Sequence, residues 1–330
     1  MGVLGAAAGA LVSRWTVEER TAPDPGRLAA DLRAGLASRP VTIPPKWFYD
    51  EKGSQLFDAI THLPEYYPTR TEEAILREHV HELPHVGTLV ELGAGYSRKT
   101  RLLLEGLTSG DRPLLFVPLD VAVGPLRDAA RRITDDFPTV TVHGVVADFE
   151  EELAPLPGTP GDRLVAFLGS TIGNLTPEPR AAFLRRLHRA AGAGDLFLLG
   201  ADLVKDPARL VRAYDDGAGV TAAFNKNVLE VLARELDAEV DPDDFDHVAV
   251  YDEELDRIEM RLRARRPLRI PVGALGTTWQ LAEGEEVLTE TSAKFRVEGI
   301  TAELDAAGFD VVQAWTDDVQ DFSLTLSRRR

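Results

Sequence analysis

Between residues 88 and 201 the chain alternates short apolar segments with longer segments that have a helical pattern. The apolar segments lie at residues 88–92, 114–120, 140–146, 163–168 and 195–201. Short strands that alternate with helices are typical of βαβ units, in which successive strands run parallel. The pattern therefore predicts an α/β fold with a doubly wound parallel sheet.

The last part of the chain modifies this sheet. A predicted helix at 297–307 leads through Gly308 into two strands, 309–316 and 320–327. Because the connection between these strands is short, they must run antiparallel. A parallel sheet that ends in an antiparallel hairpin is the Rossmann-like class I methyltransferase arrangement.

Two other parts of the chain depart from the alternation. Before the sheet, residues 27–38 and 51–62 have a helical pattern, and Thr69 with Glu72 forms a capping-box pattern at the start of a further helix. We expect residues 1–26 to be a disordered tail.

After Asp202 the alternation of strands and helices stops. Residues 203–296 contain predicted helices at 206–215 and 224–235, followed by alternating segments such as 257–265. This segment is therefore interpreted as an insertion between the last parallel strand and the C-terminal hairpin.

Composition excludes several classes of function. The 330 residues include 37 Lys and Arg against 54 Asp and Glu, a net charge of −17. This charge repels phosphate backbones and anionic membranes, so we expect neither nucleic acid nor membrane as a partner. The chain has no cysteine, which excludes disulfides, thiolate nucleophiles and zinc-thiolate sites.

Neither a signal peptide nor a membrane span is predicted. Residues 1–15 lack the basic segment that precedes the apolar part of a signal peptide, and no stretch approaches the roughly 18 consecutive apolar residues that a span requires. We expect a cytoplasmic protein that works as a monomer.

A glycine-rich turn follows the first strand of the sheet. The string ELGAG at residues 91–95 ends that strand, and a predicted helix starts near Arg98. Glycines let a ligand approach the backbone, and the helix start offers free N–H groups. Flavins, nicotinamides and simple packing remain alternatives for such a turn, but a dinucleotide fingerprint would place a third glycine at position 98.

Acidic residues end the next two strands. Asp120 can accept hydrogen bonds from both ribose hydroxyls, although a helix cap would also explain it. Asp148 and Phe149 suit the amino group and the face of an adenine. Because ligands of such sheets bind at the carboxyl ends of the strands, the combination favours S-adenosylmethionine as the cofactor.

Several longer strings resemble a known family. They are PPKWFYD (44–50), LPEYYPTR (63–70), FLGSTIGNL (167–175), LVKD (203–206), RAYDD (212–216), GVTAAFN (219–225) and LTETSAKF (288–295). In content and order they are similar to the histidine-specific methyltransferases of ergothioneine biosynthesis, and the resemblance runs from about residue 27 to the C-terminus.

The resemblance implies both an activity and a domain organisation. The activity is trimethylation of the α-amine of L-histidine to hercynine, with S-adenosylmethionine as methyl donor. The implied methyltransferase domain comprises residues 71–202 and 297–330. A smaller α+β substrate domain combines residues 27–70 with the inserted residues 203–296.

The resemblance also implies roles for individual residues. Those that line the cofactor site are Gly93, Lys99, Asp120, Asp148 and Phe149. Those that hold the substrate carboxylate are Asn174 and Tyr214. Those that contact the imidazole are Tyr66, Glu290 and Ser292, with Met260 against its face. The catalytic positions, beside the amine, are Tyr49 and the backbone of Gly169.

Each of these residues also has a purely structural interpretation. Tyr66 between prolines and Asn174 after a glycine could be ordinary turn residues. Glu290 and Ser292 alternate along a predicted strand, so they share one face, which could be a solvated edge.

Other functions also remain open. One is an N-methyltransferase of another aromatic amino acid, such as a tryptophan derivative, and another is a catalytically silent S-adenosylmethionine-binding protein. We expect no metal, because methyl transfer from a sulfonium needs none and the offsets among His79, His81 and His85 do not place them on one helix face.

Overall fold

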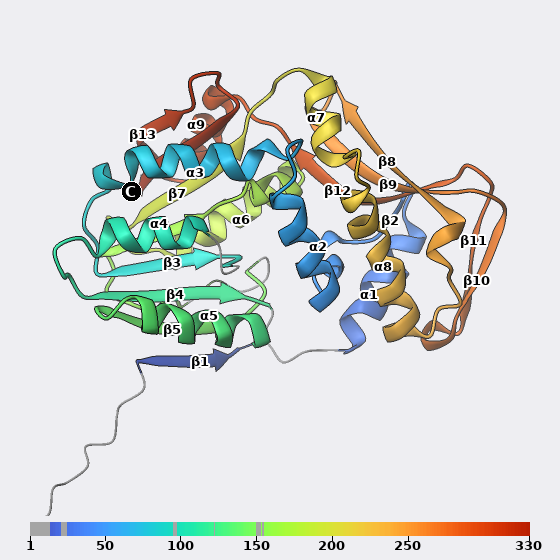
Figure 1. The fold of residues 1–330 in the computed structure, drawn as a ribbon, viewed down its shortest axis with the longest axis horizontal. Coiled ribbons are helices and arrows are strands. Elements are labelled where there is room, and N and C mark those ends of the chain that lie inside the picture. The colour runs from blue at the N-terminus through green and yellow to red at the C-terminus, as the bar shows by residue number, and fades with distance from the viewer. Residues whose placement is uncertain (1–13, 21–24, 95–97, 122, 150–152, 154) are drawn as a thin grey trace, which may run out of the picture.

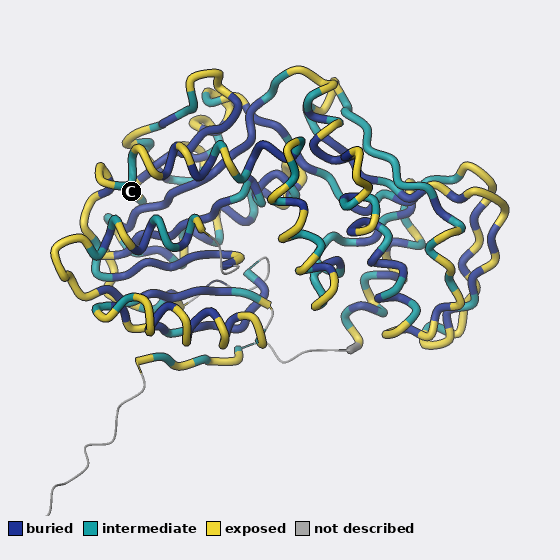
Figure 2. The backbone as a smooth tube through the Cα atoms, in the orientation of Figure 1, coloured by how far each residue is buried: buried dark blue, intermediate teal, exposed yellow. Residues whose placement is uncertain are grey.

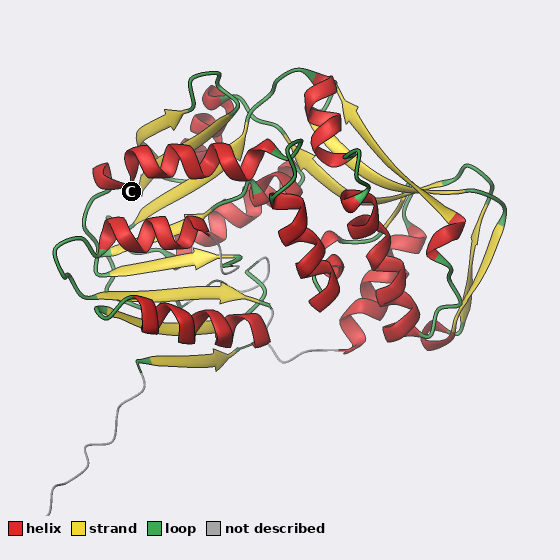
Figure 3. Ribbon diagram, in the orientation of Figure 1, coloured by secondary structure: helices red, strands yellow, loops and turns green. Residues whose placement is uncertain are grey.

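The computed structural model describes residues 14–20, 25–94, 98–121, 123–149, 153 and 155–330. Within these ranges the chain forms a central eight-stranded sheet covered by helices and, beside it, a second part built on a four-stranded sheet (Figures 1 and 3). No helix of the described ranges is both long and apolar enough to span a membrane.

The central sheet confirms the predicted α/β fold. Its strands, in spatial order, are β1 (Trp15–Glu19), β5 (Val140–Val146), β4 (Leu114–Asp120), β3 (Thr88–Leu92), β6 (Arg163–Phe167), β7 (Leu196–Asp202), β14 (Phe322–Arg329) and β13 (Phe309–Thr316). The strands from β1 to β7 in this order are parallel. The last two are antiparallel to their neighbours, as the short connection requires.

Helices cover both faces of this sheet, which explains why its strands are almost uniformly apolar. On one face lie α3 (Tyr67–His79), α4 (Arg98–Leu107) and α5 (Val123–Asp136). On the other lie α6 (Pro177–Ala190) and α9 (Val297–Ala306). The strands are accordingly buried along most of their length (Figure 2).

The expectation of a disordered tail is wrong for residues 15–19, which form strand β1 at the edge of the sheet, and for residues 25–26, which begin the first helix. Backbone pairing with β5 stabilises this strand, and the Arg14 guanidinium donates to the carbonyl oxygens of Phe137 and Pro138 at 3.0 Å. All of these partners lie more than 120 residues away in the sequence. A local pattern does not reveal pairing over that distance. Residues 1–13 and 21–24 lie outside the described part.

The predicted capping box is also wrong. Helix α3 begins at Tyr67, so Thr69 and Glu72 lie inside it, and its N-cap residue Tyr66 makes no capping hydrogen bond through its side chain. Pro68 in the first turn favours this earlier start, because proline lacks the N–H that would be unpaired there. Glu72 is fully buried and serves a different purpose.

The second part contains a smaller sheet and four helices. Its sheet consists of β2 (Val41–Thr42), β12 (Glu286–Ala293), β9 (Arg257–Ala264) and β8 (Phe245–Asp252), and a separate hairpin consists of β10 (Leu268–Val272) and β11 (Thr277–Leu281). The helices are α1 (Pro25–Ala37), α2 (Glu51–Thr61), α7 (Pro207–Tyr214) and α8 (Val220–Leu236). Apolar side chains from residues 28–67 and 210–287 form one shared core.

Helix α8 starts four residues earlier than predicted. The carboxylate of Asp216 accepts hydrogen bonds from the backbone N–H groups of Val220 and Thr221, at 3.0 and 2.7 Å. Gly219 has a φ of +75° and makes the turn into the helix. The capping residue therefore lies outside the periodic segment that predicted the helix.

The second part is placed beside the carboxyl ends of the parallel strands. The arrowheads of β3 and β4 point toward α2 (Figure 1). The chain leaves the large sheet at the end of β7, at Asp202, and returns to it after β12. At the point of return the N–H of Phe295 donates to the carbonyl oxygen of Asp202 at 2.9 Å. Residues that end the strands of the large sheet and residues of β12 can therefore contribute to one site.

Candidate active site

Gly93 occupies the turn between β3 and α4 in a conformation that favours glycine. Its φ is +67°, and its N–H donates to the carbonyl oxygen of Leu119 at 2.9 Å. A Cβ atom built on Gly93 would lie 3.7 Å from the ring of Phe149, so the two predicted cofactor residues are neighbours. Gly95 of the same motif lies outside the described residues.

The acidic residues predicted for the cofactor lie at adjacent strand ends. Asp120 is the last residue of β4, and its carbonyl oxygen accepts from the N–H of Ala147 at 3.1 Å. Asp148 is the residue directly after Ala147 and is only 8% exposed. The ring of Phe149 packs edge-on against Phe167, with centroids 5.3 Å apart. The structure therefore brings the glycine, two carboxylates and an aromatic ring to one edge of the sheet.

Lys99 and Gly169 are joined through a residue that sequence reasoning missed, Glu72. Both carboxylate oxygens of Glu72 accept from the Gly169 N–H at 2.9 Å, and one accepts from Lys99 Nζ at 2.7 Å. Gly169 has a φ of +75°. A carboxylate that is 0% exposed and holds both groups fixes the loop after β6 against helix α3.

Aromatic rings of the second part form a continuous wall. The ring of Tyr49 packs edge-on against Phe57 and Phe224, with centroids 5.6 and 5.5 Å apart. Tyr66 packs edge-on against Phe57 at 6.3 Å and against Tyr214 at 6.2 Å. The catalytic candidate Tyr49 and the two predicted substrate-binding tyrosines are therefore assembled from three separate segments of the chain.

The tyrosine hydroxyls and Glu290 influence one another electrostatically. Burial raises the pKa of Tyr49, Tyr66 and Tyr214 well above the ordinary value, and the charge of Glu290 raises each pKa further. Burial also raises the pKa of Glu290 to about 7, against a smaller lowering by Lys294. The tyrosines are therefore neutral at physiological pH, and Glu290 titrates close to it.

Within the described part of the chain, three polar groups of this cluster have no hydrogen-bond partner. They are the hydroxyls of Tyr49 and Tyr66 and the carboxylate of Glu290. Tyr49 and Glu290 are half-buried, so these polar groups converge on an accessible space, which is suited to a polar ligand that supplies the partners.

Glu290, Ser292 and Met260 lie on one face of the small sheet. Glu290 pairs with Met260 across β12 and β9, and Ser292 is two residues further along β12. The Ser292 hydroxyl lies 2.9 Å from the hydroxyl of Tyr214. The predicted shared face of Glu290 and Ser292 is therefore confirmed, and it is turned toward the aromatic wall rather than toward an exposed edge.

Asn174 ends a short 3₁₀ helix, η3 (Thr171–Asn174), that packs against β12. Its carbonyl oxygen lies 3.5 Å from the hydroxyl of Thr291, and a Cβ atom on Gly173 would lie 2.8 Å from the carbonyl oxygen of Ala293. Gly173 therefore allows η3 to approach the strand that carries Glu290 and Ser292.

A buried ionic network lies behind this face. Asp202, at the end of β7, accepts from the Tyr67 hydroxyl at 2.8 Å and pairs with the ammonium groups of Lys205 and Lys294. Burial alone would raise the pKa of Asp202, but the two ammonium groups lower it. Asp202 is therefore ionised at neutral pH and holds both lysines in place.

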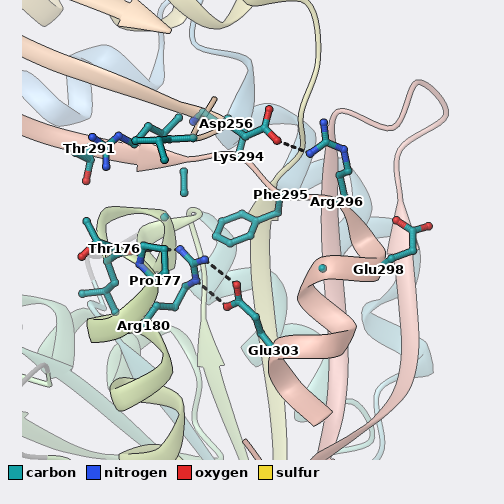
Figure 4. A pocket seen from close by; sticks show the side chains of 16 residues that line it. Thr176, Pro177, Arg180, Asp256, Thr291, Lys294, Phe295, Arg296, Glu298 and Glu303 are labelled. Carbon is teal, nitrogen blue, oxygen red and sulfur yellow. Dashed lines mark hydrogen bonds and ion pairs between the residues drawn. The ribbon is translucent and has the colours of Figure 1, made fainter. Parts of the chain in front are cut away.

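A cavity of about 350 Å³ opens on the other side of β12 (Figure 4). It is lined by Thr291 and Ala293, which alternate with Glu290 and Ser292 and so face away from them. Figure 4 shows two arginines of its lining in ion pairs, Arg180 with Glu303 and Arg296 with Asp256. None of the predicted site residues lines this cavity.

Metal ligands do not gather in the described residues, where no group of three or more His, Asp or Glu side chains is placed to hold a metal ion. The ring of His79 stacks on Trp315 with centroids 5.5 Å apart, and its Nδ1 lies 2.6 Å from a carboxylate oxygen of Glu82. This histidine packs the outer surface of α3.

Comparison with known proteins identifies the family. Residues 28–329 match the family model described as histidine-specific methyltransferase, SAM-dependent. The chain belongs to this family. It is 53% identical over 305 residues to a histidine N-alpha-methyltransferase of Mycolicibacterium smegmatis, over 92% of this chain and 95% of the relative.

Two further relatives of this histidine-specific methyltransferase differ in extent. A histidine N-alpha-methyltransferase of Mycobacterium tuberculosis is 50% identical over 321 residues, over 96% of this chain and 100% of the relative. Ergothioneine biosynthesis protein 1 of Neurospora crassa is 30% identical over 288 residues, over 84% of this chain but 32% of the relative.

Two residues of this histidine-specific methyltransferase escaped sequence reasoning, Glu72 and Lys294. Glu72 had a simpler explanation as a capping residue, and nothing near Lys294 in the sequence indicates that its ammonium meets Asp202. For Glu72 the available signal was its position on the helix face that also carries Ile75 and Leu76, since charged residues are rarely buried unless they are paired.

Proposed function

We propose that this chain transfers methyl groups from S-adenosylmethionine to the α-amine of L-histidine, three times, and so forms hercynine, the first step of ergothioneine synthesis. The observation that carries the proposal is that polar atoms of Tyr49, Tyr66 and Glu290, within an aromatic wall, have no hydrogen-bond partner among the described residues. The names of the two mycobacterial relatives support histidine as substrate.

Glu290 and Ser292 are the proposed readers of the imidazole. A neutral imidazole has one N–H and one acceptor nitrogen. Glu290 accepts the ring proton, and Ser292 donates to the other nitrogen, while Met260 lies against the ring face. The adjacency of these side chains on one face of the small sheet supports this assignment.

The amino-acid backbone of the substrate is proposed to bind between the two parts of the chain. Tyr214 and Asn174 hold the carboxylate, and Tyr66 closes the imidazole side. The hydroxyl of Tyr49 and the backbone of Gly169 orient the amine. Since burial keeps Tyr49 protonated, it positions the amine and does not act as the base that takes its proton.

The cofactor is proposed to bind at the carboxyl ends of β3, β4 and β5. Asp120 accepts from the ribose hydroxyls, while Asp148 and Phe149 contact the adenine, and Gly93 allows close approach of the backbone. Lys99 is proposed to line the end of the cofactor site that is nearest Gly169. S-adenosylmethionine supplies an electrophilic methyl group, and the chain contributes mainly the alignment of amine and methyl in one line.

The domain division is also part of the proposal. Residues 71–202 and 297–330 form the methyltransferase domain, and residues 27–70 and 203–296 form the substrate domain. The shared core of residues 28–67 and 210–287 supports this division. Such a division puts the cofactor on one domain and the imidazole on the other.

The deciding experiment incubates the purified chain with S-adenosylmethionine and each of the twenty amino acids, followed by mass spectrometry. We expect histidine to gain three methyl groups and the other amino acids to gain none. Methylation of tryptophan in place of histidine would establish the alternative aromatic substrate. Binding of the cofactor with no methylated product would indicate a silent binding protein.

A further inference from the structure

Lys294 follows strand β12 and ends inside the protein. Its side chain is 0% exposed. Its ammonium nitrogen lies 2.9 Å from each of three oxygen atoms, which belong to Asp202, Tyr214 and Ser292. An ammonium group has three protons to donate and accepts none, so these contacts use all of them.

The two hydroxyl contacts determine where the hydroxyl protons point. Because the ammonium only donates, the oxygen atoms of Tyr214 and Ser292 must both accept from Lys294. These oxygens also lie 2.9 Å apart, so one hydroxyl donates its proton to the other, and the second hydroxyl keeps a proton that neither residue accepts. A ligand with two acceptors, one beside each hydroxyl, could accept a hydrogen bond from both Tyr214 and Ser292.

Asp202 keeps the ammonium in this position. It also accepts from Tyr67 and pairs with Lys205, so the carboxylate is held on several sides. The ring of Tyr214 lies under the ammonium as well, with the nitrogen 4.7 Å from its centroid. Lys294 therefore has a defined place, and the two hydroxyls are oriented by it.

We propose that Lys294 is a positioning residue that sets substrate specificity, because it forces the hydroxyls of Tyr214 and Ser292 to act as donors toward the substrate. This inference rests on the proposed function. The substrate must then offer two acceptors, a carboxylate for Tyr214 and a pyridine-type ring nitrogen for Ser292. With Glu290 as the acceptor of the ring N–H, the pocket matches a neutral imidazole.

Rings without an acceptor nitrogen are rejected for the same reason. An indole or a thiophene offers no acceptor to the Ser292 hydroxyl, whose proton can then only return to the hydroxyl of Tyr214. A ring with an acceptor nitrogen gains a hydrogen bond that these rings lack, and sites built on such hydrogen bonds discriminate strongly. Lys294 thus acts on the substrate through two other side chains, without touching it.

The test compares Lys294→Met with Lys205→Met, a matched control. Both substitutions remove one ammonium from Asp202, but Lys205 contacts Tyr67 and the carbonyl oxygen of Leu203 in place of Tyr214 and Ser292. Calorimetry in the presence of S-adenosylhomocysteine measures the dissociation constants of L-histidine and of β-(2-thienyl)-L-alanine, which lacks a ring acceptor. Thermal melting reports the stability of each variant.

We expect Lys294→Met to weaken histidine roughly 100-fold and thienylalanine roughly 10-fold, so that the preference for histidine falls roughly 10-fold. In Lys205→Met the preference for histidine over thienylalanine should stay within about twofold of the parent, even if the melting temperature of Lys205→Met falls as far as that of Lys294→Met. Equal weakening of both ligands by Lys294→Met, or the same loss of preference in both variants, would show a structural role only and overturn the inference.

A second variant covers the case in which Lys294→Met does not fold. The amide of Lys294→Gln can donate to only two of the three oxygen atoms, so a smaller loss of preference is expected, and an unchanged preference would again overturn the inference. Failure of the proposed function would look different, since the parent itself would then neither bind nor methylate histidine.

Discussion

Glu290 on β12 lies directly opposite Met260 on β9, so a carboxylate and a thioether share one face of the small sheet. A face with one acidic and one apolar side chain is suited to a flat ring that has a polar edge. The same face carries Ser292, whose hydroxyl meets that of Tyr214. Selectivity for the ring can therefore be tested one side chain at a time.

Replacing Glu290 with alanine should reduce the preference for histidine over tryptophan. The imidazole loses the acceptor for its N–H, and the pocket gains volume for a larger apolar ring. Discrimination that rests on hydrogen-bonded groups can reach about 10⁴-fold, whereas size alone gives about 10- to 200-fold. A competition assay compares the kcat/KM ratio of the two amino acids for parent and variant. A ratio that does not move would remove Glu290 from ring recognition.

Replacing Asp120 with alanine should weaken S-adenosylmethionine binding by about 1.5 to 3 kcal/mol, or roughly one to two decades in Kd, because charge-assisted hydrogen bonds to the ribose are lost. Asp136→Ala is the matched control, since Asp136 pairs with Arg101 on the outer surface of α5. Titration calorimetry measures the affinity of both variants for S-adenosylmethionine. Equal affinities in the two folded variants would place the ribose elsewhere.

The raised pKa of Glu290 predicts how stability depends on pH. The pKa of Glu290 in the folded protein is about 7, above the ordinary 4.5, so folding favours the protonated carboxyl. The contribution of this group to the free energy of unfolding is therefore fully present below pH 4.5 and is lost as the pH rises through 7. The permanently neutral Glu290→Gln should therefore gain about 1 to 3 kcal/mol relative to the parent between pH 5 and pH 8.

Urea denaturation of both proteins without ligands, at pH 5 and pH 8, measures that difference. Glu91, whose pKa burial also raises to about 7, is present in both proteins and cancels. Parallel pH profiles of parent and variant would mean that the carboxyl of Glu290 is solvated.

Replacing Gly200 with alanine should displace Glu72 and so disturb the candidate site indirectly. A Cβ atom at this position would lie 2.0 Å from the Glu72 carboxylate that holds Gly169 and Lys99. We expect a loss of about 1 to 3 kcal/mol in stability, together with lower kcat, because Glu72 must move. Gly299→Ala in helix α9 is the control. It meets no atom within 4 Å and should gain about 0.5 to 1 kcal/mol.

Local patterns were sufficient to predict most strands of the large sheet and its terminal hairpin. Periodicity revealed the apolar strands because they are buried on both faces. Strand β1 was missed since its partners are distant in sequence, and the start of α8 was missed because Asp216 caps it from outside the periodic segment.

The candidate site divides in the same way. Gly93, Asp120 and Asp148 follow from their positions at strand ends, whereas Tyr66 and Tyr214 could be assigned only through resemblance to a family. The roles of Glu72 and Lys294 depend on contacts between segments far apart in the chain, such as the ion pair of Lys294 with Asp202. No pattern of neighbouring residues encodes such contacts.

The shared core of residues 28–67 and 210–287 also bears on the order of events at the ribosome. The first of these segments is synthesised well before the second, so the apolar faces of α1 and α2 have no partner while the strands of the large sheet emerge. Such transiently exposed surfaces are where chaperones act and where nascent chains aggregate. The second part of the fold therefore becomes ordered late in synthesis, and in a nascent chain arrested before residue 210 the apolar faces of α1 and α2 would remain uncovered.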